Sequence, residues 1–358
     1  MWSFSGIADN IHHWLSNQFN PTITTVLEMV MAGLLVIGLF AMLGLVLVLM
    51  ERKVSAWMQI RLGPNRVGPK GSLQSFADTL KLLMKEGMTP WGSDKFLFNV
   101  APFIAMIVAM LLLAPIAFAK GFQLWDLNIG VLYISAISSV SVISILMAGW
   151  ASNNKYSLLG AMRSGAQIVS YELSAGFSVL AIIVLTGSLQ VSDIIQSQAD
   201  GWWIFKGHIP VLIAFVTFII AVTAETNRAP FDLAEAESEL TAGFHTEYSG
   251  MKFALFFLAE YVNVFIVCAI GATLFLGGWM PLHIGNWQGF NHAMDYIPSS
   301  IWFFGKTFLL IFLIMWFRWT FPRLRIDQLL NLEWKYLLPI SLVNLLLVTL
   351  IAIMKWHF

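Results

Sequence analysis

The chain has 358 residues and a formal net charge of zero; 58% of its residues are hydrophobic and only 11% are charged. Its mean hydropathy is +0.76, and apolar runs near the ~20 residues that cross a bilayer recur along it. This composition excludes an ordinary soluble domain, and the balanced charge argues against nucleic acid as a partner. The chain is therefore expected to be an integral membrane protein.

Backbone exposed to lipid must form its hydrogen bonds within its own element, and these runs are longer than the ~9–11 residues of a barrel strand. We therefore predict an all-α polytopic membrane protein with eight transmembrane helices and amphipathic surface helices in its cytoplasmic loops. The spans lie near 25–50, 97–119, 131–150, 165–187, 209–224, 253–277, 299–317 and 337–355.

Between the first two spans, the stretch 72–86 places four large apolar residues, Leu73, Phe76, Leu80 and Leu83, on one helical face. That pattern predicts a helix along the membrane surface or packed under the spans. No extramembrane segment is large enough for a domain of its own, so we expect residues 1–358 to form a single membrane domain.

Lysine and arginine concentrate in alternate loops. Most of the 20 such residues lie in loops 51–96, 151–164, 225–252 and 318–336. By the positive-inside rule these loops face the cytoplasm and both termini face the periplasmic side. The first twenty residues contain no Lys or Arg and no small-residue cleavage pattern, so we expect no cleaved signal peptide.

The sequence is poor in groups that bind redox cofactors. Cys268 is its single cysteine, so the chain alone cannot ligate an iron–sulfur cluster. The seven histidines lie in loops or at span ends, and no nucleotide-binding or zinc-protease motif is present. Any redox centre must therefore belong to another subunit.

Three ionisable residues fall well inside the apolar runs: Glu172, Glu260 and Lys306. Such a group costs ~2.5–3.5 kcal/mol near the centre of a span, and those that occur usually face the bundle interior and serve ion pathways. Both glutamates lie roughly 6 Å to the cytoplasmic side of their span centres at a rise of ~1.5 Å per residue, so they can pass protons at one depth. Alternatively, Glu260 and Lys306 form a structural ion pair and Glu172 is hydrogen-bonded near a helix end.

The stretch 225–240, ETNRAPFDLAEAESEL, gathers carboxylates between two apolar runs. In a helix, Asp232, Glu235 and Glu239 would share one face, where like charges destabilise by a few tenths of a kcal/mol per pair. A solvated acidic loop is one interpretation. The functional interpretation is a protonatable cluster at the cytoplasmic surface.

The loop 51–71, ERKVSAWMQIRLGPNRVGPKG, alternates basic residues with large apolar ones before a Gly-Pro turn. This pattern can bury its apolar face at the membrane surface and present arginines to an amphipathic ligand. Topogenic positive charge would explain the basic residues equally well, although it would not explain the turn.

Four segments carry a resemblance to a known family. They are ERKVSAWMQIRLGPNRVGPKGSLQSFADTLKLLMKEG (51–87), SNNKYSLLGAMRSGAQIVSYELSAG (152–176), ETNRAPFDLAEAESELTAGFHTEYSGMKFALFFLAEY (225–261) and PRLRIDQLLNLEWK (322–335). The chain resembles the family of H subunits (subunit 1), which are membrane subunits of the proton-pumping NADH:quinone oxidoreductases, respiratory complex I. The resemblance covers nearly all of it from about residue 25.

The resemblance implies an eight-helix subunit that forms part of the quinone chamber and carries an acidic path coupling quinone reduction to proton translocation. That path would comprise Glu51, Glu172, Glu225, Asp232, Glu235, Glu237, Glu239 and Glu247, to which the intramembrane charges Glu260 and Lys306 are added. The positions implied to lie near bound quinone are Arg52, Arg61, Phe231 and Arg318.

Further expectations concern partners and place. The resemblance implies the bacterial inner membrane, contact with lipid, and a position that joins the peripheral-arm quinone-module subunits to the antiporter-like membrane subunits. Quinone would be the substrate, no cofactor would bind this chain, and the iron–sulfur clusters and flavin would lie in partner subunits. Two alternatives remain open: the homologous membrane subunit of an energy-converting hydrogenase, and a stand-alone cation transporter. A transporter would need repeats or broken helices, which are not visible.

Overall fold

A computed structural model describes residues 4–233, 240–283 and 287–354. Within these ranges, eight helical segments are long and apolar enough to cross a membrane, which confirms the all-α polytopic class. They are α2 (Pro21–Met58), α4 (Lys95–Leu113), α5 (Gly130–Ala151), α6 (Lys155–Thr186), α9 (His208–Glu225), α11 (Gly250–Phe275), α13 (Ser299–Thr320) and the continuous run of α14 (Ile326–Leu332), the π-helical η3 (Glu333–Leu337) and α15 (Leu338–Met354).

Shorter elements connect these segments. They are α1 (Phe4–Ser16), η1 (Pro69–Gly71), α3 (Gln74–Met84), β1 (Ala117–Ala119), β2 (Phe122–Gln123), α7 (Val191–Gln196), α8 (Trp203–Lys206), η2 (Gly243–His245) and α12 (Gln288–Asp295). The two strands pair antiparallel.

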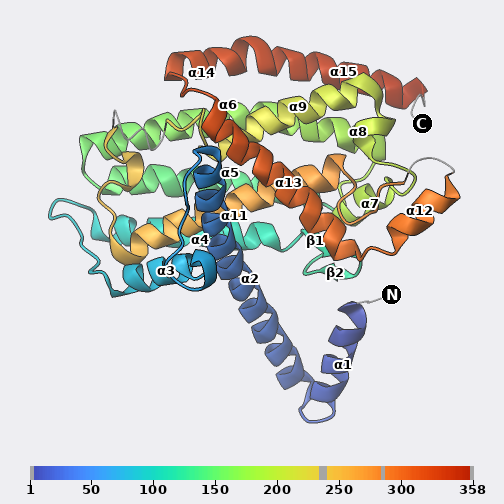
Figure 1. Cartoon of the computed structure of the whole chain (residues 1–358), viewed down its shortest axis with the longest axis horizontal. Coiled ribbons are helices and arrows are strands. Elements are labelled where there is room, and N and C mark those ends of the chain that lie inside the picture. Colours follow the sequence, from blue (N-terminus) through green and yellow to red (C-terminus); the bar gives the residue numbers. More distant parts are fainter. Residues whose placement is uncertain (1–3, 234–239, 284–286, 355–358) are drawn as a thin grey trace.

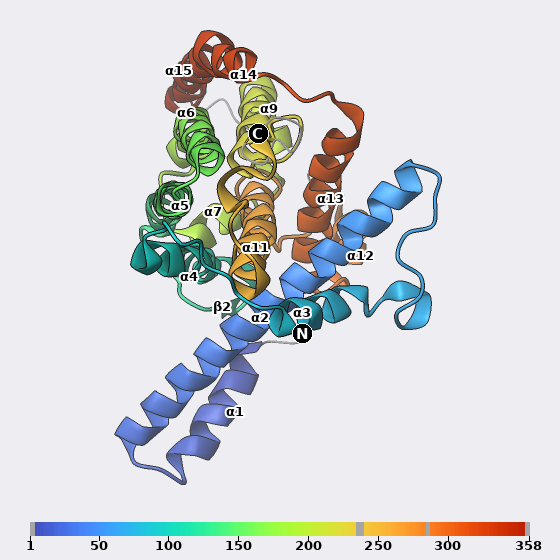
Figure 2. The same ribbon diagram turned by 90° about the vertical axis from the view of Figure 1, so that its left-hand side faces the viewer.

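The long helices pack around α11. Figures 1 and 2 show α14 and α15 running alongside α6 and α9, while α2 and α13 cross the bundle obliquely. One large apolar cluster contains much of α11, including Val262, Phe265 and Ala269, which are fully buried. Since α11 touches α2, α4, α9 and α13, a polar group on α11 is within reach of several helices.

The first half of α2 projects from the bundle together with α1 (Figures 1 and 2). Its apolar side chains there, such as Met29 and Leu34, are 71% and 64% exposed. Continuous packing against the rest of the chain begins near Phe40, which is 1% exposed. The C-terminal half of α2, from about Phe40 to Met58, is therefore the part that packs in the bundle, and its C-terminal end is called the inner end below.

The predicted span 97–119 was wrong at its end. Helix α4 stops at Leu113, and residues 117–119 form strand β1. The cause lies in Pro115, which has no N–H to donate to the carbonyl of Leu111. The predicted spans 25–50 and 165–187 were shorter than the helices α2 and α6, which cover 21–58 and 155–186. Polar residues with good helix propensity continue each helix beyond its apolar run.

Helix α6 begins ten residues before its predicted start. The side chain of Asn154 accepts a hydrogen bond from the N–H of Tyr156 at 2.9 Å and caps the helix. Gly187, at φ +70°, ends it in the left-handed conformation. The added turns carry Gly160, which packs directly on the backbone of η2.

The surface helix predicted at 72–86 is present as α3. Its apolar residues Leu73, Phe76 and Leu83 are 52–55% exposed, so the chain itself leaves that face uncovered. Helix α3 contacts α2 and α11. It thus lies beside the inner end of α2, where the first candidate site residues are found.

We predict that Gly160→Ala lowers the amount of folded protein in membranes. A Cβ at Gly160 would lie 2.8 Å from Cα of Gly243 and 3.0 Å from the N of Phe244, and backbone on both sides cannot move cheaply. The matched control is Gly176→Ala on the same helix, where a Cβ would have no heavy atom within 4 Å. Alanine favours helix over glycine by ~0.8–1.0 kcal/mol, so the control should unfold at the parent temperature or above. Equal thermal unfolding of both variants would contradict the close contact.

Candidate functional site

Arg228, in the turn after α9, is buried between carboxylates. Its NH1 donates to Oε2 of Glu51 on α2 at 3.1 Å, and its NH2 lies 3.2 Å from Oε1 of Glu260 on α11. Its guanidinium carbon lies 4.3 Å from the ring centre of Tyr261. Burial alone would lower the pKa of Arg228, but Glu51 and Glu260 hold that pKa above its ordinary value. The guanidinium therefore stays charged.

Arg318, near the end of α13, shares the carboxylate of Glu51 with Arg228, because its NH1 donates to Oε1. Glu51, Arg228, Glu260 and Arg318 thus form a charged junction of two cations and two anions. A buried charge is tolerated when it is paired and hydrogen-bonded. Glu51, Arg228 and Arg318 line a void of only about 10 Å³, so little space is left between these three side chains.

Arg52, next to Glu51 on α2, points elsewhere and donates to Oδ2 of Asp78 on α3. Lys53 donates to the carbonyls of Pro64 and Lys70, at 2.5 and 2.7 Å. These contacts hold α3 and the basic loop, which is the connection between α2 and α3 (residues 59–73), against the inner end of α2. The predicted quinone residue Arg61 lies in this loop, exposed, and its Nε donates to Oε1 of Gln59 at 2.6 Å.

Gln167 on α6 fixes the turn that contains Arg228. Its Nε2 donates to the carbonyl oxygens of Ala224 and Phe231, both at 2.7 Å. Phe231 is 5% exposed, and its ring packs on Tyr171 with the ring centres 5.5 Å apart. The turn is therefore a packed part of the bundle interior.

Asp232 follows in the same segment and is 8% exposed. Its Oδ2 accepts a hydrogen bond at 2.9 Å from NH2 of Arg323, in the connection between α13 and α14. The N–H of Leu324 donates to the carbonyl of Pro230 at 3.1 Å. Asp232 is thus tied to the C-terminal helices. Glu235, Glu237 and Glu239 lie outside the described residues.

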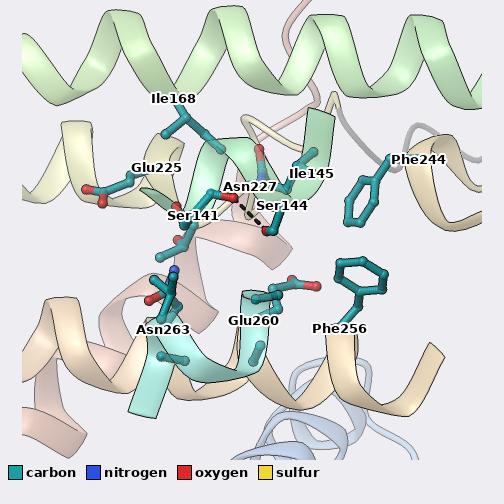
Figure 3. Close-up of a pocket in the computed structure, with 15 residues that line it drawn as sticks. Ser141, Ser144, Ile145, Ile168, Glu225, Asn227, Phe244, Phe256, Glu260 and Asn263 are labelled. Carbon is teal, nitrogen blue, oxygen red and sulfur yellow. Dashed lines mark hydrogen bonds between the residues drawn. The ribbon is translucent and has the colours of Figure 1, made fainter. Parts of the chain in front are cut away.

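A cavity of about 60 Å³ lies beside the charged junction and is lined mainly by α4, α5 and α11, with Glu225 at the end of α9 and the turn that follows it. Figure 3 shows Glu225, Asn227, Glu260 and Asn263 around it, with Ser144 donating to the carbonyl of Ser141 at 2.7 Å. At ~30 Å³ for each water, there is room for about two molecules. The cavity can therefore hold a hydrogen-bonded water chain among the carboxylates.

A larger cavity of about 330 Å³ lies between α4, α5, α6, α9 and α11. Glu172 and Glu225 both line it, together with Asn263 and many apolar side chains. Glu225 and Asn263 line the smaller cavity as well. Together the two cavities reach from Glu260 to Glu172, with Glu225 on the wall of both.

Glu172 accepts a hydrogen bond from the hydroxyl of Ser139 on α5. The alternative interpretation placed a hydrogen-bonded Glu172 near a helix end. The hydrogen bond is present, but the position was wrong, because α6 starts at Lys155 and Glu172 lies well inside it. Glu247 accepts a hydrogen bond at 2.6 Å from Nδ2 of Asn154, the residue that caps α6. The Glu247 carboxylate is therefore engaged at the start of that helix.

The alternative interpretation in which Glu260 and Lys306 form an ion pair was wrong. Lys306 donates to the carbonyls of Leu276, Gly278 and Met280 at 2.5, 2.9 and 2.6 Å. Leu276 follows the far end of α11, about 24 Å along the helix from Glu260 at ~1.5 Å per residue. The carbonyls that follow the end of α11 attract the ammonium group, and Glu260 pairs with Arg228 instead.

The sequence did not reveal roles for Arg228, Tyr261 and Asn263. One signal was present for Arg228, which is the single cation within the acidic stretch 225–240. Tyr261 directly follows Glu260, and Asn263 lies one helical turn further along α11. A search for polar residues one turn from each intramembrane carboxylate would have found Asn263.

Comparisons with known proteins agree along nearly the whole chain. The family described as NADH dehydrogenase matches residues 30–349. The chain is 57% identical over 358 residues to the H subunit of NADH-quinone oxidoreductase from Bacteroides fragilis (strain YCH46), with 100% of both chains covered. It is 56% identical to the protein of the same name from Bacteroides thetaiotaomicron, also with 100% of both chains covered. The corresponding protein of Carboxydothermus hydrogenoformans is 47% identical over 343 residues, which cover 96% of this chain and 94% of that one.

We predict that Arg228→Met lowers the yield of folded protein strongly, because breaking a buried ion pair from one side costs about 3–5 kcal/mol. The double variant Arg228→Met/Glu51→Gln restores zero net charge at the junction and should recover part of that yield. Yield and thermal unfolding in detergent are the measurements.

Arg52→Met is the matched control, because its side chain is 41% exposed and its partner Asp78 24% exposed. An exposed pair contributes about 0–1 kcal/mol, so the control should lose little. If Arg52→Met and Arg228→Met lost equal stability, the charged junction would stabilise the fold no more than the more exposed Arg52–Asp78 pair does.

Proposed function

The chain belongs to the NADH dehydrogenase family, in which its full-length relatives are H subunits of NADH-quinone oxidoreductase. From this premise we propose that it forms part of the quinone-binding chamber and carries the acidic path that couples quinone reduction to proton translocation. The observation that carries the proposal is the pair of cavities that share Glu225 and Asn263 and join Glu260 to Glu172.

Three carboxylates on the walls of two neighbouring cavities can exchange protons through water that fills both cavities. Glu260 forms an ion pair with Arg228. Glu172 accepts one hydrogen bond from a hydroxyl group, and Glu225 lies on the wall shared by the two cavities. The proposed path therefore begins at Glu260, which is paired with a cation, and continues through Glu225 to Glu172, whose carboxylate accepts a hydrogen bond from a hydroxyl.

The charged junction supplies the link to quinone chemistry. Reduction of a quinone consumes protons and changes the charge close to it. Arg52, next to Glu51, holds α3 beside the basic loop that we place at the quinone chamber. Trp57 in the last turn of α2 and Ile60 and Leu62 in the loop that follows are 73–96% exposed and supply apolar surface beside Arg61. We assign the quinone head group to this side of the junction, with Arg318 and Phe231 behind it.

The remaining acidic residues extend the path toward the loop surface. Asp232, held by Arg323, would receive protons or charge from the chamber, with Glu235, Glu237 and Glu239 following it in sequence and Glu247 beside the start of α6. Lys306 lies against backbone carbonyls at the far end of α11, and we assign it to the outer limit of the path.

The proposed partners follow from the relatives' names. NADH oxidation requires flavin and iron–sulfur clusters, which we assign to peripheral-arm subunits of the complex, while proton transfer continues in antiporter-like membrane subunits. Quinone is the substrate, membrane lipid surrounds the spans, and both termini face the periplasmic side of the bacterial inner membrane. Full-length identity to the H subunits of this enzyme favours this function over that of a hydrogenase component and over a stand-alone cation transporter.

We predict that Glu172→Gln and Glu225→Gln each assemble normally and lose most NADH:quinone activity. Glutamine keeps the shape and hydrogen-bonding capacity of the side chain and removes its titratable proton. The quinone-dependent rate in sealed vesicles is compared with NADH oxidation by a water-soluble artificial acceptor, which reports the amount of assembled complex.

Glu28→Gln is the control, because Glu28 lies near the start of α2 and pairs with Nδ1 of His12 at 2.6 Å, far along the helix from the cavities. It should keep the parent rate. Parent-level quinone activity in both Glu172→Gln and Glu225→Gln would exclude a proton path through these cavities.

A further inference from the structure

The 330 Å³ cavity has properties that proton transfer does not require. Most of its wall is apolar and is built from α5, α6 and α11. Along α6 the wall runs from Glu172 through Gly176 and Val179 to Ile183, which is about 16 Å at ~1.5 Å per residue. An apolar wall does not stabilise bound water, whereas it stabilises an alkyl chain by removing the apolar surface of that chain from water.

The polar groups of the cavity are unevenly distributed. Glu172 and Glu225 lie at the end nearest the turn after α9, and no Lys, Arg or His is among the lining residues. The hydroxyls of Ser135, Ser138 and Thr273 donate to backbone carbonyls of their own helices. The site thus offers two carboxylates without a lining cation at one end and hydrocarbon at the other.

The cavity wall also reaches the outer surface of the bundle. Leu132 on α5 is 54% exposed and Leu180 on α6 is 43% exposed, and both line the cavity. In a membrane these side chains face the acyl chains of lipid or a neighbouring subunit. An amphiphile dissolved in the bilayer can therefore approach the cavity from its apolar side.

We propose that this cavity is a binding site for lipophilic amines. The ammonium group pairs with Glu172 and Glu225, and the alkyl chain lies along the wall of α6 toward Ile183. Charge complementarity selects a cation over a neutral alcohol or an anion of the same length. The binding site is independent of the proposed function; inhibition of turnover by the amine rests on that function, because the ammonium group would occupy the proton-binding carboxylates.

The test uses dodecylamine with a diazirine at the end of its chain, added to membranes that contain the assembled complex. After illumination we expect labelled residues on α5, α6 or α11 at the end of the cavity away from Glu172. Unlabelled dodecylamine should compete with the probe, and dodecanol at the same concentration should not. Glu172→Gln should weaken apparent binding about tenfold, which corresponds to ~1.4 kcal/mol.

A second pair of variants tests the site without changing its charge. Gly176 lines the cavity, and a Cβ there would meet no heavy atom within 4 Å, so Gly176→Leu should fill the space and abolish labelling. Gly33→Leu is the matched control, because Gly33 lies in the projecting half of α2 and also has no heavy atom near its Cβ position. Its labelling should equal that of the parent.

Equal competition by dodecanol would make the cavity a slot for any acyl chain and would overturn the proposal. Unchanged labelling in Gly176→Leu would overturn it as well. Labelling reports binding without turnover, so the two proposals fail separately. Specific labelling without loss of NADH:quinone activity would support the amine site and contradict the acidic path.

Discussion

The pairing of Arg228 with Glu51 and Glu260 is the interaction on which the arrangement of the polar interior depends. Three helices and one turn bring charge into an apolar bundle, and ions there are stable only when their charges balance. Arg318 completes that balance from α13. Because the partners come from residues far apart in the sequence, the junction forms only when α2, α11 and α13 are all in place.

The positions of the two cavities are fixed by this junction and by Gln167. Holding the turn after α9 in one conformation leaves Glu225 on the wall of two spaces that packed side chains would otherwise have filled. Close packing is the norm in protein interiors. Voids lined by carboxylates are therefore features that the surrounding helices maintain.

The sequence predicted the eight spans well because a bilayer requires long apolar helices whatever their neighbours are. It also identified Glu172 and Glu260 as internal, since a charge within an apolar run has few alternatives. It failed for Lys306 and Arg228, whose partners depend on crossing angles and helix ends that periodicity does not report. Predicted span ends were wrong where Pro115 stopped α4 and where Asn154 capped α6 early.

Glu51 and Arg52 occupy one turn of α2, and successive residues of a helix point about 100° apart. The first belongs to the buried junction, and the second binds Asp78 on the surface helix α3. The backbone of one helical turn therefore carries both contacts, the ion pair to the surface helix and the ion pair to the buried cations. The position of α3 and the geometry of the pairs with Arg228 and Arg318 are consequently referred to the same few residues of α2.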